Sequence, residues 1–288
     1  MVVKQSELSP YLPINTVLNG LPIAFSLSTA STISSLSKED ADKVKVVATG
    51  SYVPYSNVQV RGATWIMNIG DGPYQQIRGT VLDSPTVLSW ADLVVNFYGL
   101  ITQGGLTIKK HYPVDMSTHL AADGSAPAPM IDVVINAQTF KFVLDTAGLA
   151  SNLNTATAQA LHVAPVQEAI EGAPQTEQNL TNRALLPITV NQGAQQWMHC
   201  TVADKYNSLS WKDATANWDI VILPEGVSLV QKGQGQKKID DTIKAQGSAT
   251  SSGLTSSTLF TGSNGMGLLL IILVLVALYL TVKSFKLK

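Results

Sequence analysis

Short runs of alternating apolar and polar residues recur along the chain and predict β-strands. The strongest runs occupy residues 16–18, 23–27, 64–69, 76–82, 133–135, 140–144, 188–190 and 197–203. Asn19 and Gly20 separate the first two runs, and this dipeptide is typical of a two-residue β-hairpin turn. Helical signals are short: Ser37 precedes an acidic segment at 38–43, and residues 154–161 resemble it. The pattern predicts an all-β fold with short helices.

The chain also contains an internal repeat. Residues 17–44 align without a gap with residues 134–161 at an offset of 117, and residues 72–108 align with 193–229 at an offset of 121. The second block pairs the motif Leu-Ser-Trp-x-Asp-x-x-x-Asn of the first copy with the same motif in the second. Two ungapped blocks in the same order indicate a duplicated domain.

A long apolar run lies near the C-terminal end. Residues 266–282 (MGLLLIILVLVALYLTV) carry no charge. As a helix they would span about 26 Å, close to the roughly 30 Å hydrocarbon core of a bilayer. We therefore predict a transmembrane helix. This membrane anchor would include Met266, Leu270, Leu273, Tyr279 and Val282.

The segments that flank this run predict a tether and leave the membrane orientation open. Residues 233–265 are rich in Gly, Ser and Thr, which is typical of a flexible linker. The lysines of residues 283–288 favour a cytoplasmic C-terminus. The first nine residues do not resemble a secretory signal peptide, which favours a cytoplasmic N-terminal part instead. The expected location is a membrane, with a single-pass C-terminal anchor.

These features predict five segments along the chain. The two copies meet near residues 121–130, where Gly, Pro and Ala are frequent. The predicted segments are a first lobe at 1–120, a second lobe at 121–232, a linker at 233–265, a transmembrane helix at 266–282 and a basic tail at 283–288.

The second copy contains a motif with a family resemblance. Residues 140–148 (FKFVLDTAG) resemble the active-site strand and loop of the aspartic proteases, with Asp145 at the catalytic position. Residues 218–224 (WDIVILP) resemble an apolar strand of the same family. The resemblance covers roughly residues 14–108 and 131–230. It implies two β-barrel lobes with pseudo-twofold symmetry, as in pepsin, each contributing one carboxylate.

The chain departs from this family at a catalytic residue. Aspartic proteases use two carboxylates that share one proton, so that one activates water while the other polarises the scissile carbonyl. The first-copy equivalent of Asp145 is Ser28, whose hydroxyl cannot share that acidic proton. We expect a catalytically degenerate site in which Asp145 is a half-buried carboxylate, hydrogen-bonded by Thr146, Ser28 and loop amides.

Among the other loop positions, two family glycines are replaced and two family threonines are retained. Ala30 and Ala147 replace the family's glycine, and their methyl groups are expected to crowd the loops that bring backbone amides to the carboxylates. Thr29 and Thr146 are retained, and in the family these threonines lock the two loops together. A homodimer that pairs two copies of Asp145 is disfavoured, because the loop of the first copy already occupies the partner's place.

Several further side chains are candidates for weaker roles. Tyr52 and Tyr55 lie where the family carries its flap hairpin, so they are candidates to contact a bound strand. Trp90 and Trp211 are expected in the core, with an aromatic ligand platform as the alternative. Cys200 is expected to be a small packed side chain. The four histidines lie apart along the chain, so we predict neither a metal site nor a cofactor.

The charge balance excludes some classes of partner. The chain has 20 acidic and 19 basic residues and a formal net charge of -1, so it has no electrostatic bias toward nucleic acid. A single cysteine excludes a disulfide framework. The expected partners are the lipid bilayer and a protein, for example capsid or other assembly subunits, and an oligomer is compatible with the sequence.

Three functions remain open at this point. We favour a membrane-anchored, non-enzymatic structural or binding protein with a degenerate aspartic-protease-like ectodomain, for example a virion protein that links an internal membrane to the capsid. A protease cleft binds an extended peptide by strand addition, and this capacity does not require the carboxylates. The alternative is a membrane-anchored aspartic endopeptidase that uses Asp145. The third hypothesis is a cell-surface receptor or adhesion module on a stalk.

Overall fold

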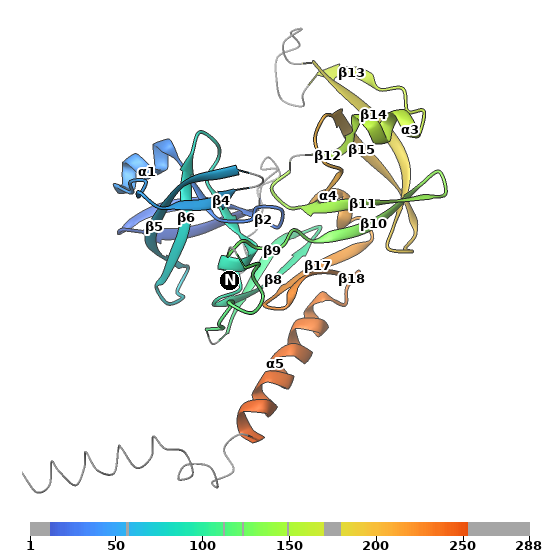
Figure 1. Ribbon diagram of the computed structural model, residues 1–288. Coiled ribbons are helices and arrows are strands. Elements are labelled where there is room, and N and C mark those ends of the chain that lie inside the picture. Colours follow the sequence, from blue (N-terminus) through green and yellow to red (C-terminus); the bar gives the residue numbers. More distant parts are fainter. Residues whose placement is uncertain are drawn as a thin grey trace, which may run out of the picture. The chain divides into compact units, whose positions relative to one another are not determined.

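The computed structural model describes residues 12–55, 58–111, 113–122, 124–148, 150–169 and 180–252, and strands dominate it (Figure 1). The first copy contains β1 (Pro13–Leu18), β2 (Leu21–Ser28), β3 (Ser35–Ser37), α1 (Lys38–Val44), β4 (Tyr52–Tyr55), β5 (Val58–Ile69), β6 (Gln75–Leu82), β7 (Val87–Ser89), α2 (Trp90–Leu93), β8 (Phe97–Thr102) and β9 (Gly105–Lys110). The elements that follow are β10 (Met130–Ile135), β11 (Gln138–Asp145), β12 (Ser151–Asn154), α3 (Thr155–Ala160), β13 (Val166–Ala169), β14 (Leu180–Val190), β15 (Gln195–Ala203), β16 (Ser208–Ser210), α4 (Trp211–Ala214), β17 (Trp218–Leu223), β18 (Gly226–Gln231) and α5 (Gly235–Ser252).

Each copy forms a six-stranded β-barrel. The first sheet has the order β1-β2-β7-β3-β6-β5-β4, and a further pairing of β1 with β5 closes six of its seven strands into a ring. The second sheet has the order β10-β11-β16-β12-β15-β14-β13 and is closed by β10 and β14. The two orders match strand for strand, so the predicted duplication is confirmed. Two barrels with few short helices fit an aspartic-protease-like fold, as the sequence resemblance implies.

A third sheet combines strands from both copies. Its order is β18-β17-β8-β9, and β17 pairs antiparallel with β8, where Ile222 lies opposite Gly99. Nearly every residue of these two central strands is buried, which explains why their sequences are mostly apolar rather than alternating. Among the described residues, those up to Ile239 form one compact unit.

The first hairpin of each copy turns through left-handed backbone. Asn19 and Gly20 have φ values of 51° and 81°, which confirms the predicted turn between β1 and β2. The equivalent residues between β10 and β11 are Asn136 and Ala137, with φ values of 49° and 62°. Because a Cβ atom disfavours this region, Ala137 is strained where Gly20 is not.

Replacing Ala137 with glycine is therefore expected to stabilise the protein by about 1 kcal/mol. Urea unfolding of the two proteins measures the difference. The matched control is Gly20→Ala, which should destabilise by a similar amount, because an added Cβ there meets no atom within 4 Å and only the backbone strain changes. A loss of stability in Ala137→Gly would contradict the assignment of strain to this turn.

The two helices that the sequence predicts, α1 and α3, begin at polar caps. The Ser37 hydroxyl accepts a hydrogen bond from the Asp40 N–H at 3.0 Å and caps α1. The Asn154 side chain accepts one from the Ala156 N–H at 2.9 Å and caps α3.

Trp90 and Trp211 open α2 and α4 with only 1% and 3% of their surface exposed. The core interpretation of both tryptophans is thereby confirmed.

The two barrels fill one equivalent core position differently. In the first copy, Gly79 leaves space for Trp65, since an added Cβ would lie 2.4 Å from the Trp65 ring. Cys200 occupies the equivalent position, because it pairs with Ala184 as Gly79 pairs with Ala63. Its thiol is fully buried, and burial raises its pKa to about 12. Cys200 is therefore a packed side chain, as predicted.

The predicted flexible linker over residues 233–265 is wrong for residues 235–252, which form α5. The composition is misleading because Ser, Thr and Gly concentrate after residue 246, whereas residues 236–246 (QKKIDDTIKAQ) contain good helix formers and no proline. The buried Asp219 carboxylate accepts hydrogen bonds from the Gly233 and Gly235 N–H groups at 2.8 and 3.0 Å. A carboxylate at this end of a helix is favourable for the helix dipole.

The predicted membrane anchor lies outside the described residues. It comprises residues 266–282, followed by the basic tail at 283–288. Within the part of the chain that the structure describes, no helix combines the length and the hydropathy needed to cross a membrane.

Candidate functional site

Hydrogen bonds between two equivalent loops form the centre of the site. The loops follow β2 and β11, and Thr29 and Thr146 are fully buried in them. The Thr29 N–H donates to Thr146 Oγ1 at 3.0 Å, and the Thr146 N–H donates to Thr29 Oγ1 at 3.2 Å. Each hydroxyl also donates across to the other strand, Thr29 to the Leu144 carbonyl at 2.5 Å and Thr146 to the Leu27 carbonyl at 2.8 Å. The predicted locking of the two loops is confirmed.

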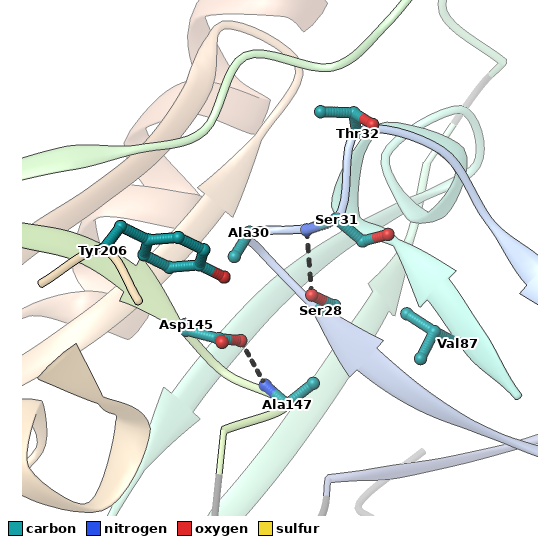
Figure 2. A pocket seen from close by; sticks show the side chains of 8 residues that line it. All are labelled: Ser28, Ala30, Ser31, Thr32, Val87, Asp145, Ala147 and Tyr206. Atoms are coloured by element: carbon teal, nitrogen blue, oxygen red, sulfur yellow. Dashed lines mark hydrogen bonds between the residues drawn. The ribbon is translucent and has the colours of Figure 1, made fainter. Parts of the chain in front are cut away.

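Ser28 and Asp145 occupy matching places beside these threonines. Ser28 Oγ accepts a hydrogen bond from the Ser31 N–H at 2.9 Å (Figure 2). Asp145 Oδ1 accepts one from the Gly148 N–H, also three residues ahead, at 3.2 Å, and one from the Ala147 N–H at 3.0 Å. Serine therefore takes the local position of the carboxylate and accepts the equivalent loop amide.

Two expectations about this region are wrong in detail. Among the described residues, neither Thr146 nor Ser28 donates a hydrogen bond to Asp145. The Thr146 hydroxyl donates to the Leu27 carbonyl instead. The methyl group of Ala147 does not keep its amide away from the carboxylate, since that amide is a donor to it. Alanine is accommodated here because the loop has no left-handed φ at this position.

A cavity of about 210 Å³ opens between the two loops (Figure 2). Its polar groups include the Ser28 hydroxyl, the Asp145 carboxylate and the Tyr206 phenol, with methyl groups between them. The lining residues are Ser28, Ala30, Ser31, Thr32, Val87, Asp145, Ala147 and Tyr206. The structure thus brings together the predicted loop residues Ser28 and Ala30 of the first copy with Asp145 and Ala147 of the second.

Burial controls the charge of the Asp145 carboxyl. Desolvation raises its pKa above the ordinary value of 3.8, while the Ala147 and Gly148 amides and the positive charge of Lys205 act in the opposite direction. Desolvation is the largest of these effects. The carboxyl is therefore easier to protonate than an exposed aspartate.

Tyr206 is a site residue that the sequence reasoning missed. Its loop, between β15 and β16, is held by Asn152, whose side-chain N–H donates to the Tyr206 carbonyl at 3.0 Å. Asn154 donates in the same way to the Lys205 carbonyl at 2.7 Å. At an offset of 121 the first-copy equivalent of Tyr206 is Pro85. The replacement of proline by tyrosine between the two copies is the sequence signal that could have identified Tyr206 as a site residue.

The predicted flap region forms a hairpin of β4 and β5, with Tyr52 opposite Arg61. The Tyr52 side chain is 59% exposed and does not line the cavity. The Tyr55 side chain lies outside the part that the structure describes. Contact of these tyrosines with a bound strand stays a prediction.

Comparisons with known proteins give a limited picture. No protein-family model matches the chain, and no curated protein matches it. A similar solved structure is EIAV protease complexed with the inhibitor HBY-793, which is 22% identical over 29% of this chain and 82% of that chain, with a TM-score of 0.22. The description of the fold therefore depends on the two barrels and their cross-bonded loops.

A further partly buried carboxylate, that of Asp92, is hydrogen-bonded to the segment that follows the first loop. The Ser34 hydroxyl donates to Asp92 Oδ2 at 2.5 Å and accepts from the Ser89 N–H at 2.9 Å. The second copy repeats this network, with Ser151 and Ser210 donating to Asp213. Both aspartates belong to the repeated Leu-Ser-Trp-x-Asp motif, which the sequence identified without a role. Each carboxylate connects a short helix to a strand of the same copy. Asp92 on α2 binds Ser34, which precedes β3, and Asp213 on α4 binds Ser151, which begins β12.

Burial raises the pKa of Asp92 to about 6, although the Ser34 hydrogen bond opposes the shift. The pKa of Asp213 is also raised by burial, against the Ser151 and Ser210 hydrogen bonds. A carboxyl whose folded pKa exceeds its unfolded value adds stability below the unfolded pKa. This stability is lost as the pH rises through the folded pKa.

Replacing Asp92 with asparagine should therefore remove a pH-dependent part of the stability. Asparagine keeps an acceptor for the Ser34 hydroxyl but cannot ionise. Between pH 4 and 7.5, the unfolding free energy of the wild type should fall by roughly 2–3 kcal/mol relative to Asp92→Asn, from the shift of Asp92 from 3.8 to about 6. Urea unfolding across this range measures the difference, with exposed Asp83→Asn as control. Parallel curves for wild type and Asp92→Asn would contradict the assignment.

Two of the four histidines make pairwise side-chain contacts among the described residues. His199 Nε2 lies 3.1 Å from Glu168 Oε2 at the surface, and the His111 ring stacks on Tyr98 with centroids 4.1 Å apart. The described residues contain no group of three or more His, Cys, Asp or Glu side chains that could hold a metal ion.

Proposed function

We propose that this protein is a non-enzymatic binding or structural protein built on an aspartic-protease-like fold. The observation that carries the proposal is Ser28, which occupies the position of a second catalytic carboxylate beside Asp145. A lone carboxylate cannot share a proton with a partner acid, so water activation and carbonyl polarisation cannot be divided between two groups. The serine hydroxyl has no accessible ionisation that would replace this function.

The remaining features of the site favour binding. The cavity combines a carboxylate, hydroxyl groups and methyl groups, which suits recognition of a side chain. The Thr29 and Thr146 hydrogen bonds fix both loops, so little ordering is needed when a ligand enters. β4 is the last strand in the order of its sheet, so its outer edge can pair with an extended segment.

The proposed setting is a membrane-linked assembly, for example a virion in which the protein connects an internal membrane to the capsid. The uncharged run at 266–282 supports the membrane part of this proposal. The low charge of the chain, 14%, suits close packing against protein neighbours. Deleting residues 266–288 should release the protein into the soluble fraction, and a deletion variant that stays bound to membranes would contradict the anchor.

A cleavage assay tests the non-enzymatic assignment. Wild type and Asp145→Ala are incubated with a mixed peptide library from pH 3 to 7, and products are measured by mass spectrometry. We expect neither protein to cleave above the background without protein. Cleavage by the wild type that is lost in Asp145→Ala would overturn the proposal in favour of a membrane-anchored aspartic endopeptidase. Thermal unfolding of both proteins controls for folding.

A further inference from the structure

One oxygen of the Asp145 carboxylate is available to a ligand. Oδ1 accepts both loop amides, whereas Oδ2 accepts no hydrogen bond from the described residues. No ion pair among the described residues includes this carboxylate, although the charge of Lys205 acts on it from a distance. A desolvated carboxylate without a counter-charge is unfavourable, and a cation entering the cavity would relieve that cost.

The surrounding groups suit a cation on an alkyl chain. Ser28 Oγ accepts only the Ser31 amide among the described donors and keeps a lone pair that can accept a further hydrogen bond. The Tyr206 ring lines the same cavity as the Asp145 carboxylate (Figure 2), and an aromatic ring attracts a nearby ammonium group. The side chains of Ala30 and Val87 provide apolar surface for methylene groups.

We infer that the cavity binds a primary alkylammonium group, presented by a lysine side chain of a partner protein. The ammonium donates to Asp145 Oδ2 and Ser28 Oγ, and the lysine methylenes pack against the alanine and valine side chains. An ammonium has three donors and no acceptor, which matches a site that offers acceptors. A carboxylate ligand would instead be repelled by Asp145. This inference rests on the proposed function, because it assigns Asp145 to recognition rather than to catalysis.

The difference between the two copies supports this assignment. Asp145 and Tyr206 both belong to the second copy, and their first-copy equivalents are Ser28 and Pro85. The negative charge and the aromatic ring therefore lie on one side of the cavity. The first copy supplies a neutral hydroxyl and apolar surface opposite them. Such a one-sided arrangement gives the bound ammonium a single orientation.

Calorimetric titration of the full chain in detergent at pH 7.5 tests the inference. The probes are n-butylammonium and n-butanol, which have similar shape but differ in charge. The wild type should bind n-butylammonium at least tenfold more tightly than n-butanol. Asp145→Asn, which preserves the shape, should lose at least tenfold of the ammonium affinity. The matched control is Asp83→Asn, which removes an 80% exposed carboxylate and should change nothing.

Equal affinity for n-butylammonium and n-butanol, or unchanged ammonium affinity in Asp145→Asn, would overturn the inference. A second probe pair is Nα-acetyl-lysine-N-methylamide, which keeps its side-chain ammonium, and the equivalent norleucine compound, which lacks one. Tighter binding of the lysine compound than of n-butylammonium supports a lysine on a partner chain, and weaker binding overturns that source. The cleavage assay separates the two proposals. Asp145-dependent cleavage defeats the proposed function, whereas absent cleavage with absent ammonium preference defeats only this inference.

Discussion

Replacing Thr146 with valine is expected to lower the free energy of unfolding by about 3 kcal/mol. Valine has nearly the same shape as threonine, but it loses the acceptor for the Thr29 N–H and the donor to the Leu27 carbonyl. Both bonds are buried, and each buried polar group left without a partner costs about 1–3 kcal/mol. Urea unfolding of the full chain in detergent measures the change.

Thr64→Val is the matched control for Thr146→Val. Thr64 is exposed on β5, so the same change of side chain should alter the unfolding free energy by less than about 0.5 kcal/mol. Thr29→Val should resemble Thr146→Val, because Thr29 makes the equivalent bonds to the Thr146 N–H and the Leu144 carbonyl. Equal stabilities of Thr146→Val and Thr64→Val would show that the cross-bonded loops do not hold the two copies together.

Local signals in the sequence were sufficient to predict the strands and turns of each copy, whereas the two barrels were implied by the family resemblance. Asn19 and Gly20 adopt the left-handed turn that their residue types favour, and Ser37 caps the helix that follows it. Both features are formed by residues that lie close together in the sequence. The repeat then extended these local predictions to the second copy, where the strand order is the same.

Contacts between distant segments could not be predicted in this way. β8 and β17 pair across about 120 residues, and strands buried on both faces have no alternating pattern that would identify a partner. For α5, Gly and Ser suggested a flexible linker, although the Asp219 carboxylate accepts the amides that open the helix. Asp219 lies 16 positions before Gly235, so the sequence around the helix start does not reveal this interaction.

The same distinction applies to the candidate site. Ser28, Asp145 and the two threonines could be identified because they lie in one short motif that occurs twice. Tyr206 lies on the loop that follows β15, and this loop is held by Asn152 on the neighbouring strand β12. The pairing of Ser34 with Asp92 likewise joins residues 58 positions apart. Strand pairing creates these contacts, so no spacing in the sequence reveals them.

The loops of the two copies nevertheless share one hydrogen-bond geometry, although the residue that accepts the bond differs between them. Ser28 Oγ accepts the amide of Ser31, as Asp145 Oδ1 accepts the amide of Gly148. The backbone that would support a second carboxylate is therefore in place. This argues that the residue type at position 28, rather than the loop conformation, limits the chemistry of the site.

Replacing Ser28 with aspartate is consequently expected to raise peptide cleavage roughly 10²-fold or more above the wild type at pH 4–5. The introduced carboxylate would face the cavity beside Asp145 and could share a proton with it, and a positioned acid–base group contributes about 10²–10⁴-fold to a rate. Mass spectrometry of a mixed peptide library measures the products. Ser28→Asn has the same shape without an ionisable group and should stay at background, as should Ser28→Asp combined with Asp145→Asn. A folded Ser28→Asp variant that cleaves nothing would contradict the argument and would assign the limit to the alanines at positions 30 and 147.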